Sequence, residues 1–234
     1  MNVDNEPGVI LHSRPFTDSK KILNVLTPSY GRFNLVARHS RSMPLPKAFA
    51  VFSLSWLGKA DLKTLRQCEE LVPVRLTQGR PLFCGMYLNE LCARVLPEYQ
   101  AQGRVYEQYI ETIDKLSGTN NDQLLMEVLL RRFEFSLLAS LGLAINFEEC
   151  ADGHQISRGD NTYFHYDVEH GFRRCLNENM MPEHVSEVFR ADDIACIRKQ
   201  EWSADALKSA KKLSRIAFRP LLGERPLKSR ELFT

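Results

Sequence analysis

A row of positive charges near the end of the sequence has the spacing needed to bind a polyanion. Lys208, Lys212, Arg215 and Arg219 are separated by four, three and four residues. At about 100° per residue, a helix places them on one narrow stripe, with Lys211 at its edge. No acidic residue interrupts the row as an i,i+4 partner. We interpret it as a row that can follow phosphates, with a solvated helix face as the alternative.

A second group of cations lies at the end of a predicted strand. In the stretch GRFNLVARHSR, residues 31–41, apolar and polar residues alternate with a period of two, which is typical of a half-buried strand. Arg38, His39 and Arg41 then fall within four residues, and Lys47 follows closely. A strand that ends in clustered charge predicts either a solvated loop or an anion-binding loop.

Two adjacent arginines, Arg131 and Arg132, lie inside the apolar stretch LLRRFEFSLLASLG. A guanidinium group next to apolar side chains can hold a carboxylate through two parallel hydrogen bonds while an apolar ligand group packs beside it. The alternative is that both arginines pair with Glu127 and Glu134 on the same helix. Of the two, Arg132 lies at the rim of the predicted apolar face and is the better candidate for a ligand.

Residues 150–176 contain the side chains that could hold a metal or perform hydrolysis. Cys150, His154, His165, His170 and Cys175 are potential zinc ligands, but no C-x₂-C pair occurs among the six cysteines. The sequence also lacks the GxSxG, HExxH and GxxxxGK[ST] motifs. We therefore expect reduced thiols rather than disulfides, no bound zinc, and no catalytic residues.

Charge is distributed unevenly along the 234 residues, although the net charge is only +2. Residues 1–80 carry 12 Lys and Arg against 6 Asp and Glu, and residues 201–234 carry 8 against 4. The segment between them is acidic. Segregated charge of this kind can mark a surface that binds a polyanion, whereas the bulk charge says little about partners.

The N-terminal third of the sequence is predicted to be all β. Five strands over residues 8–16, 20–27, 31–38, 51–58 and 61–69 alternate apolar and polar residues, and PSYG at 28–31 is a turn signal. Residues 43–49 contain two prolines and are predicted to form a loop. Short, closely spaced strands predict a small closed barrel, either an OB-fold or an SH3-like barrel.

The remainder is predicted to be mainly helical. Helices are expected over 82–96, 103–116, 122–141, 182–189, 192–198 and 204–221. The third has Asp122 as a candidate N-cap and Gly142 as its stop. The polar, glycine-containing residues 150–176 are expected to form a loop or small hairpin. The resulting fold class is α+β, with one domain over residues 1–78 and a helical domain over 79–234.

Three stretches of the sequence resemble the RecO family of bacterial DNA repair proteins. They are residues 8–38 (GVILHSRPFTDSKKILNVLTPSYGRFNLVAR), 129–150 (LLRRFEFSLLASLGLAINFEEC) and 219–232 (RPLLGERPLKSREL), in the family's order. The resemblance implies an N-terminal OB-fold and a C-terminal helical domain. It also implies a recombination mediator that binds single- and double-stranded DNA, anneals strands and, with RecR, helps load RecA.

The resemblance gives the charged residues specific roles. It implies that the helical domain binds the acidic C-terminal tail of single-stranded DNA-binding protein, and we place that site at Arg131 and Arg132 because they are adjacent arginines inside an apolar helix. We predict that DNA is bound by ten cations: Arg14, Lys20, Arg32, Arg38, Arg41, Lys47, Lys208, Lys212, Arg215 and Arg219. At two places the sequence departs from the family. His39 stands where glycine is common, and Gly153 and Glu178 stand where some relatives have zinc-binding cysteines.

The sequence also leads to expectations about location and assembly. The N-terminus MNVDNEPG is polar and no apolar run reaches the roughly 18 residues that span a bilayer. We therefore expect a cytoplasmic, nucleoid-associated protein that is a monomer on its own and does not use a membrane. The competing hypotheses are a metal-dependent nuclease or hydrolase and an adaptor that binds only proteins.

Overall fold

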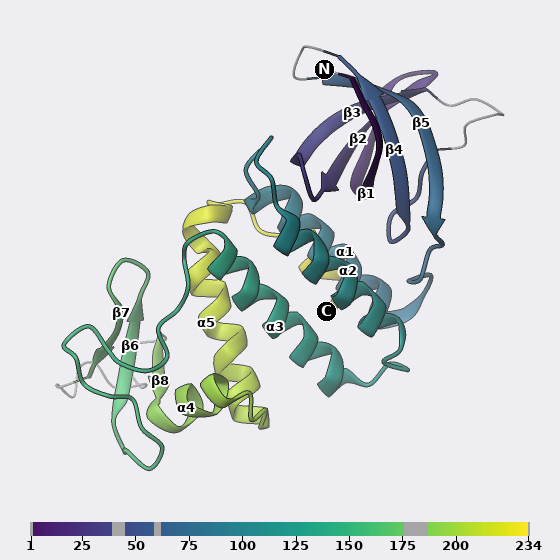
Figure 1. Ribbon diagram of the computed structural model, residues 1–234. Coiled ribbons are helices and arrows are strands. Elements are labelled where there is room, and N and C mark those ends of the chain that lie inside the picture. The colour runs from purple at the N-terminus through teal and green to yellow at the C-terminus, as the bar shows by residue number, and fades with distance from the viewer. Residues whose placement is uncertain (1, 39–44, 59–61, 176–186, 234) are drawn as a thin grey trace. The chain divides into compact units, whose positions relative to one another are not determined.

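The structure of the protein, a computed structural model, describes residues 2–38, 45–58, 62–175 and 187–233 (Figure 1). The chain forms two compact units. The first comprises residues 1–126 and 225–234, and the second comprises residues 127–224. The division falls inside helix α3 (Gln123–Ser140). The first unit contains the barrel, two further helices and the C-terminal segment.

Five strands close the barrel of the first unit. They are β1 (Asn2–Thr17), β2 (Lys20–Thr27), β3 (Gly31–Arg38), β4 (Val51–Leu57) and β5 (Leu62–Val72). The order around the barrel is β1-β2-β3-β5-β4, with β1 pairing β4 and β3 running parallel to β5. This topology is that of an OB-fold, and it decides between the two barrels that periodicity left open.

Apolar side chains at alternating positions of the strands fill the interior of the barrel. Leu23 and Val25 of β2, and Phe33 and Leu35 of β3, are fully buried in one cluster with Trp56 of β4. Residues between them point outward, so Lys20, Arg32 and Arg38 lie on the outer face of β2 and β3.

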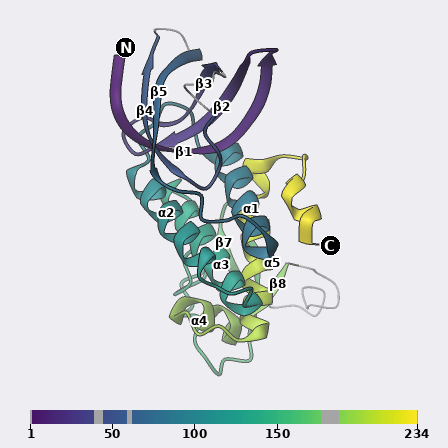
Figure 2. The ribbon, with the colours of Figure 1, turned by 90° about the vertical axis from the view of Figure 1, so that its right-hand side faces the viewer.

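Two helices and the C-terminal segment complete the first unit (Figure 2). Helix α1 (Gly79–Val95) is followed by α2 (Gly103–Ser117), and the chain returns at its end as a short 3₁₀ helix, η2 (Lys228–Phe233). The Glu90 carboxylate of α1 accepts hydrogen bonds from the backbone N–H groups of Lys228 and Ser229 and from the Ser229 hydroxyl, at 2.6–2.9 Å. This contact caps η2 and fixes residues distant in sequence against α1.

The connection between α1 and α2 lies against the barrel. Gly31 has a φ of +66°, and a Cβ added there would lie 1.7 Å from the backbone oxygen of Gln100. Only glycine permits both the left-handed backbone and this close approach. The Tyr99 N–H donates to the Arg32 carbonyl at 3.0 Å, which holds the same connection at β3.

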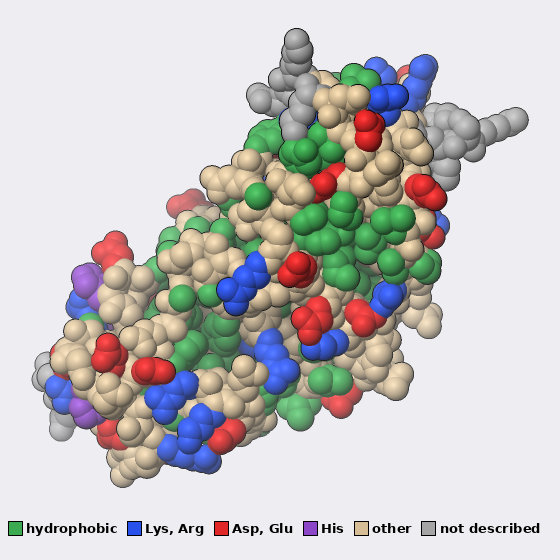
Figure 3. All heavy atoms as spheres, viewed as in Figure 1, with side chains coloured by type: hydrophobic (Ala, Val, Ile, Leu, Met, Phe, Trp, Pro, Cys, Tyr) green, Lys and Arg blue, Asp and Glu red, His purple; other side chains and the backbone are tan. Residues whose placement is uncertain are grey.

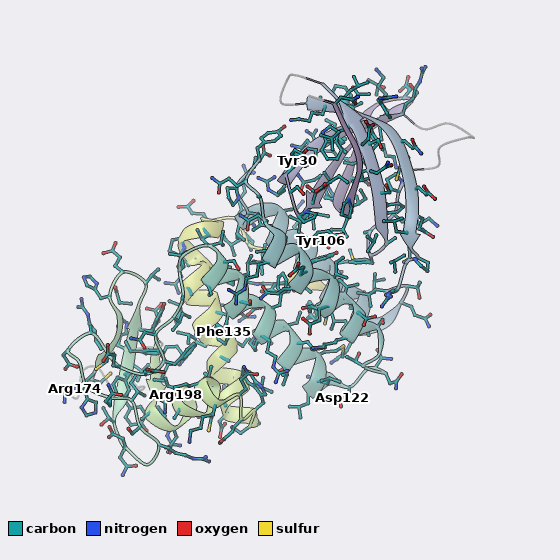
Figure 4. The ribbon with its side chains drawn as sticks, viewed as in Figure 1. Tyr30, Tyr106, Asp122, Phe135, Arg174 and Arg198 are labelled. Carbon is teal, nitrogen blue, oxygen red and sulfur yellow. The ribbon has the colours of Figure 1, made fainter. Side chains whose placement is uncertain are left out.

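The second unit is a small sheet with helices. Strands β6 (Tyr163–Asp167), β7 (Gly171–Arg174) and β8 (Val188–Arg190) pair in the order β7-β6-β8. Helices α4 (Ala191–Lys199) and α5 (Ala204–Leu222) follow. Phe135 of α3, labelled in Figure 4, packs with Phe147 against a cluster formed by Ile197, Ala206 and Ala210.

Most predicted elements are confirmed, with two corrections. The structure places β8 where residues 188–189 were predicted to be helical, while 182–186 lie outside the described residues. Strand β1 begins at Asn2 rather than at residue 8, because the polar residues at its start pair with β4. The predicted terminal signals of α3 are both present. The Leu125 N–H donates to the Asp122 carboxylate at 3.1 Å, and Gly142 takes a φ of +78°.

The predicted domain boundary between residues 78 and 79 stays a prediction. The structure adds that α1 and α2 belong to the same compact unit as the barrel. A division by contacts and a division by sequence family need not coincide, because a helix can continue from one unit into the next.

Candidate nucleic-acid interface

The outer face of β1, β2 and β3 carries a group of exposed cations. Arg14 of β1, Lys20 of β2 and Arg38 of β3 are all exposed, and we call these three residues the barrel cation cluster. Lys20 stands opposite Arg38, and Arg14 stands opposite Ile22, two residues further along β2 and on the same face as Lys20. The three side chains therefore project from neighbouring positions of one sheet face. Figure 3 shows blue Lys and Arg side chains at the upper end of the barrel.

The pairing of Lys20 with Arg38 is unfavourable for the isolated fold. Like charges directly opposite each other on an antiparallel pair destabilise a sheet. Within the described residues, neither side chain forms an ion pair that could offset the repulsion. A bound anion would remove this cost, so the arrangement is suited to a phosphate.

Arg32, also on the outer face of β3, has a structural contact instead. Its side chain is only 14% exposed and forms an ion pair with Glu98 at 3.0 Å. Its Nε donates to the Leu96 carbonyl at 2.8 Å. Arg32 thus connects the barrel to the end of α1 through two of its five guanidinium N–H donors, and its role in DNA binding stays a prediction.

A cleft of about 860 Å³ lies beside the barrel cation cluster, within the first unit. Its barrel side is formed by residues of β1, β2 and β3, among them His12, Arg14 and Asn24. Its other side is formed by α1 and η2, including Met86, which is 43% exposed. The cleft combines an apolar wall with polar and basic side chains, which is the composition expected of a site for a strand of nucleic acid.

The four cations of α5, Lys208, Lys212, Arg215 and Arg219, are not equally available. The Lys212 ammonium donates to the Val188 carbonyl at 2.5 Å and lies 4.3 Å from the centre of the Phe189 ring. Burial lowers the pKa of Lys212 below its ordinary value. Arg219 pairs with Glu187 at 2.8 Å. Lys208 and Arg215 are exposed and form no ion pair within the described residues.

The remaining predicted DNA contacts, Arg41 and Lys47, follow β3 in the sequence. Lys47 is exposed, whereas Arg41 falls outside the described residues. Both stay predictions.

The two arginines of α3 have different surroundings. Arg131 is buried and forms an ion pair with Glu134, as the alternative interpretation of the sequence stated for this residue. Arg132 is exposed and lies one turn before the half-buried Phe135. Of the two, Arg132 is therefore the one whose guanidinium group a ligand can reach.

An ion pair holds the polar segment of the second unit. Arg174 of β7, labelled in Figure 4, donates to the Asp152 carboxylate through Nε at 2.9 Å and through Nη2 at 2.7 Å. The Cys150 thiol donates to the same carboxylate at 2.6 Å. The hydrogen bond from Cys150, together with those from Arg174, lowers the pKa of Asp152 to about 2. Within the described residues, no three His, Cys, Asp or Glu side chains gather as a metal site, and the expectation of no zinc stays a prediction.

Sequence reasoning missed the partners of the α5 cations. Val188 and Glu187 lie 24 and 32 residues from the side chains that they contact. No local spacing rule connects residues so far apart.

Comparison with known proteins gives the family. The description "Recombination protein O N terminal" matches residues 1–73, and "Recombination protein O C terminal" matches residues 76–231. The chain belongs to the RecO family. Its relatives include proteins named DNA repair protein RecO from Cellvibrio japonicus and Aliivibrio salmonicida. The first is 38% identical over all of this chain and 98% of the relative, and the second is 33% identical over 96% and 92%.

The match to the RecO family confirms the resemblance of the three sequence stretches. It also agrees with the observed order of an OB-fold barrel followed by helices. Among the described residues of this RecO chain, no helix has the length and apolar character needed to cross a membrane.

Proposed function

We propose that this chain is a DNA repair and recombination mediator that acts by binding DNA and proteins rather than by catalysis. Membership of a family whose relatives are named DNA repair protein RecO supports the repair role. The observation that supports DNA binding most directly is the barrel cation cluster, in which Lys20 and Arg38 face each other and neither forms an ion pair within the described residues. The adjacent cleft gives a strand room to follow the sheet face.

The affinity for DNA should depend steeply on salt if this cluster binds phosphates. Each phosphate contact contributes about −0.7 to the log–log slope for single strands, so the double variant Lys20→Gln/Arg38→Gln should reduce the slope by about 1.4. The measurement is fluorescence anisotropy of labelled oligo(dT) at several salt concentrations. The same titration with duplex DNA tests binding to double strands.

A charge-matched variant provides the control. Arg104→Gln/Lys115→Gln removes two exposed cations from α2 instead of the barrel face. It should leave the slope nearly unchanged. Equal changes for the two double variants would mean that only the net charge matters and would remove the barrel face from the proposal.

The proposal extends to a protein partner, the acidic C-terminal tail of single-stranded DNA-binding protein. Exposed Arg132 beside half-buried Phe135 provides a cation next to an aromatic ring, which suits a carboxylate next to an apolar side chain. We further propose that RecR cooperates with this chain in loading RecA, which rests on the family alone. Annealing of complementary strands follows from the same family role.

Arg132→Ala tests the peptide site separately from the DNA site. A charge-assisted contact is worth roughly 1.5–3 kcal/mol, so binding of a tail peptide should fall about tenfold or more. Binding of bare oligo(dT) should stay the same, and Arg104→Ala should change neither affinity. Unchanged peptide binding would place the peptide site elsewhere.

A further inference from the structure

An aromatic side chain is exposed where the barrel cation cluster ends. Phe16 of β1 is 49% exposed and lies at the irregularity between Pro15 and Thr17, next to the turn into β2. All residues from His12 to Lys20 are exposed, so the Phe16 side chain adds little to the core. An aromatic ring that is half in water contributes less to folding than a buried one.

Phe16 is one of the residues that line a hollow of about 680 Å³ within the first unit. Its walls come from the end of the β1–β2 hairpin and from Leu45. Lys20 and Lys21 line the same hollow, and Asp18 is its acidic member. The hollow is therefore bordered by an aromatic residue, an apolar neighbour and two lysines, which are consecutive on β2 and extend from its opposite faces.

We propose that Phe16 stacks on an unpaired nucleobase while Lys20 and Lys21 hold the adjoining phosphates. A nucleotide combines a flat π-face with an anion, and the hollow presents a partner for each. Loops between strands 1 and 2 of OB-folds are common positions for binding oligonucleotides. Bases inside a duplex are already stacked on their neighbours, so the contact favours single strands over double strands. The inference rests on the proposed DNA binding and assigns a base contact that phosphate recognition alone does not require.

The test uses the full chain and two labelled oligomers of equal length, one of oligo(dT) and one with abasic sites in place of all bases. Phe16→Leu keeps an apolar side chain but removes the π-face. Stacking is worth enough that this variant should bind oligo(dT) about fivefold or more weakly. It should bind the abasic oligomer as the unmodified chain does. Its salt slope should not change, because no phosphate contact is lost.

Two further variants make the result specific. Phe16→Trp keeps an aromatic face, so it should retain affinity for oligo(dT), and its added fluorescence should be quenched on binding. Leu71→Ala removes another exposed apolar side chain, 54% exposed on β5, and should leave both affinities unchanged.

Each failure has a distinct meaning. If Phe16→Leu binds oligo(dT) as tightly as the unmodified chain, the stacking contact is wrong while DNA binding by the barrel stands. If this variant loses affinity for both oligomers equally, the effect does not come from base stacking and the inference is likewise overturned. If the unmodified chain binds neither oligomer at low salt, the proposed DNA binding fails as well.

Discussion

The barrel face and the α5 helix both carry basic residues, but the two regions use them differently. On the barrel, Lys20 and Arg38 are exposed and face each other across two strands. On α5, Lys212 donates to the Val188 carbonyl and Arg219 pairs with Glu187. On the barrel, the repulsion between Lys20 and Arg38 would be reduced by a bound anion. On α5, two of the four cations of the row already contact other residues of the second unit.

The comparison shows that a periodic row of cations is insufficient evidence for a binding surface. The α5 row is the more regular of the two in sequence, with spacings of four, three and four. Two of its four members, Lys212 and Arg219, contact the Val188 carbonyl of β8 and the Glu187 carboxylate, which lie far from them in the sequence. A surface binds an anion through the cations that do not already contact other residues of the protein, and tertiary contacts determine which cations those are.

The largest expected effect contrasts two arginines of the same strand. Arg32→Gln should lower the free energy of unfolding by about 1–2 kcal/mol, because it removes the ion pair with Glu98 and the hydrogen bond to Leu96. Arg38→Gln, its control, should not lower stability and should raise it slightly, because Arg38 is exposed and its charge is repelled by Lys20. Urea unfolding of both variants measures the difference. Similar losses would remove the distinction between a structural and a binding arginine on β3.

A second expected effect concerns α5. Lys212→Met keeps the apolar stem of the side chain but removes the hydrogen bond to Val188 and the cation above Phe189. We expect the free energy of unfolding to fall by about 1 kcal/mol. Lys208→Met, one turn earlier and exposed, should have little effect. If Lys208→Met were equally destabilising, the helix surface rather than the Lys212 contacts would be responsible.

The smallest expected effect compares the two surfaces as DNA ligands. Lys208→Gln/Arg215→Gln removes two exposed cations of the α5 row that form no ion pair within the described residues. This variant should change the salt slope for oligo(dT) by no more than about 0.7, which corresponds to the loss of one phosphate contact. The matching barrel variant, Lys20→Gln/Arg38→Gln, should change it about twice as much. A larger change for the α5 variant would reverse the comparison and make this helix the principal DNA-binding element.

The sequence by itself determined the class of each element wherever local periodicity was strong. The alternation in β2 and β3 and the apolar face of α3 follow from side-chain burial on strands and helices, and Asp122 and Gly142 mark the ends of α3 through hydrogen bonding and backbone conformation. The resemblance in three stretches was also sufficient to name the family that comparison later confirmed.

Tertiary structure alone decided what the charged residues do. Arg32 and Arg38 occupy equivalent outward positions on one strand, so no local pattern distinguishes them, and only the approach of Leu96 and Glu98 fixes the first. The start of β1 escaped prediction because Asn5, at a φ of 57°, interrupts the alternation and the strand exists through pairing with β4. Ion pairs and strand pairing join residues that are far apart in sequence. Such contacts produce no periodic pattern in the sequence, so they cannot be predicted from it.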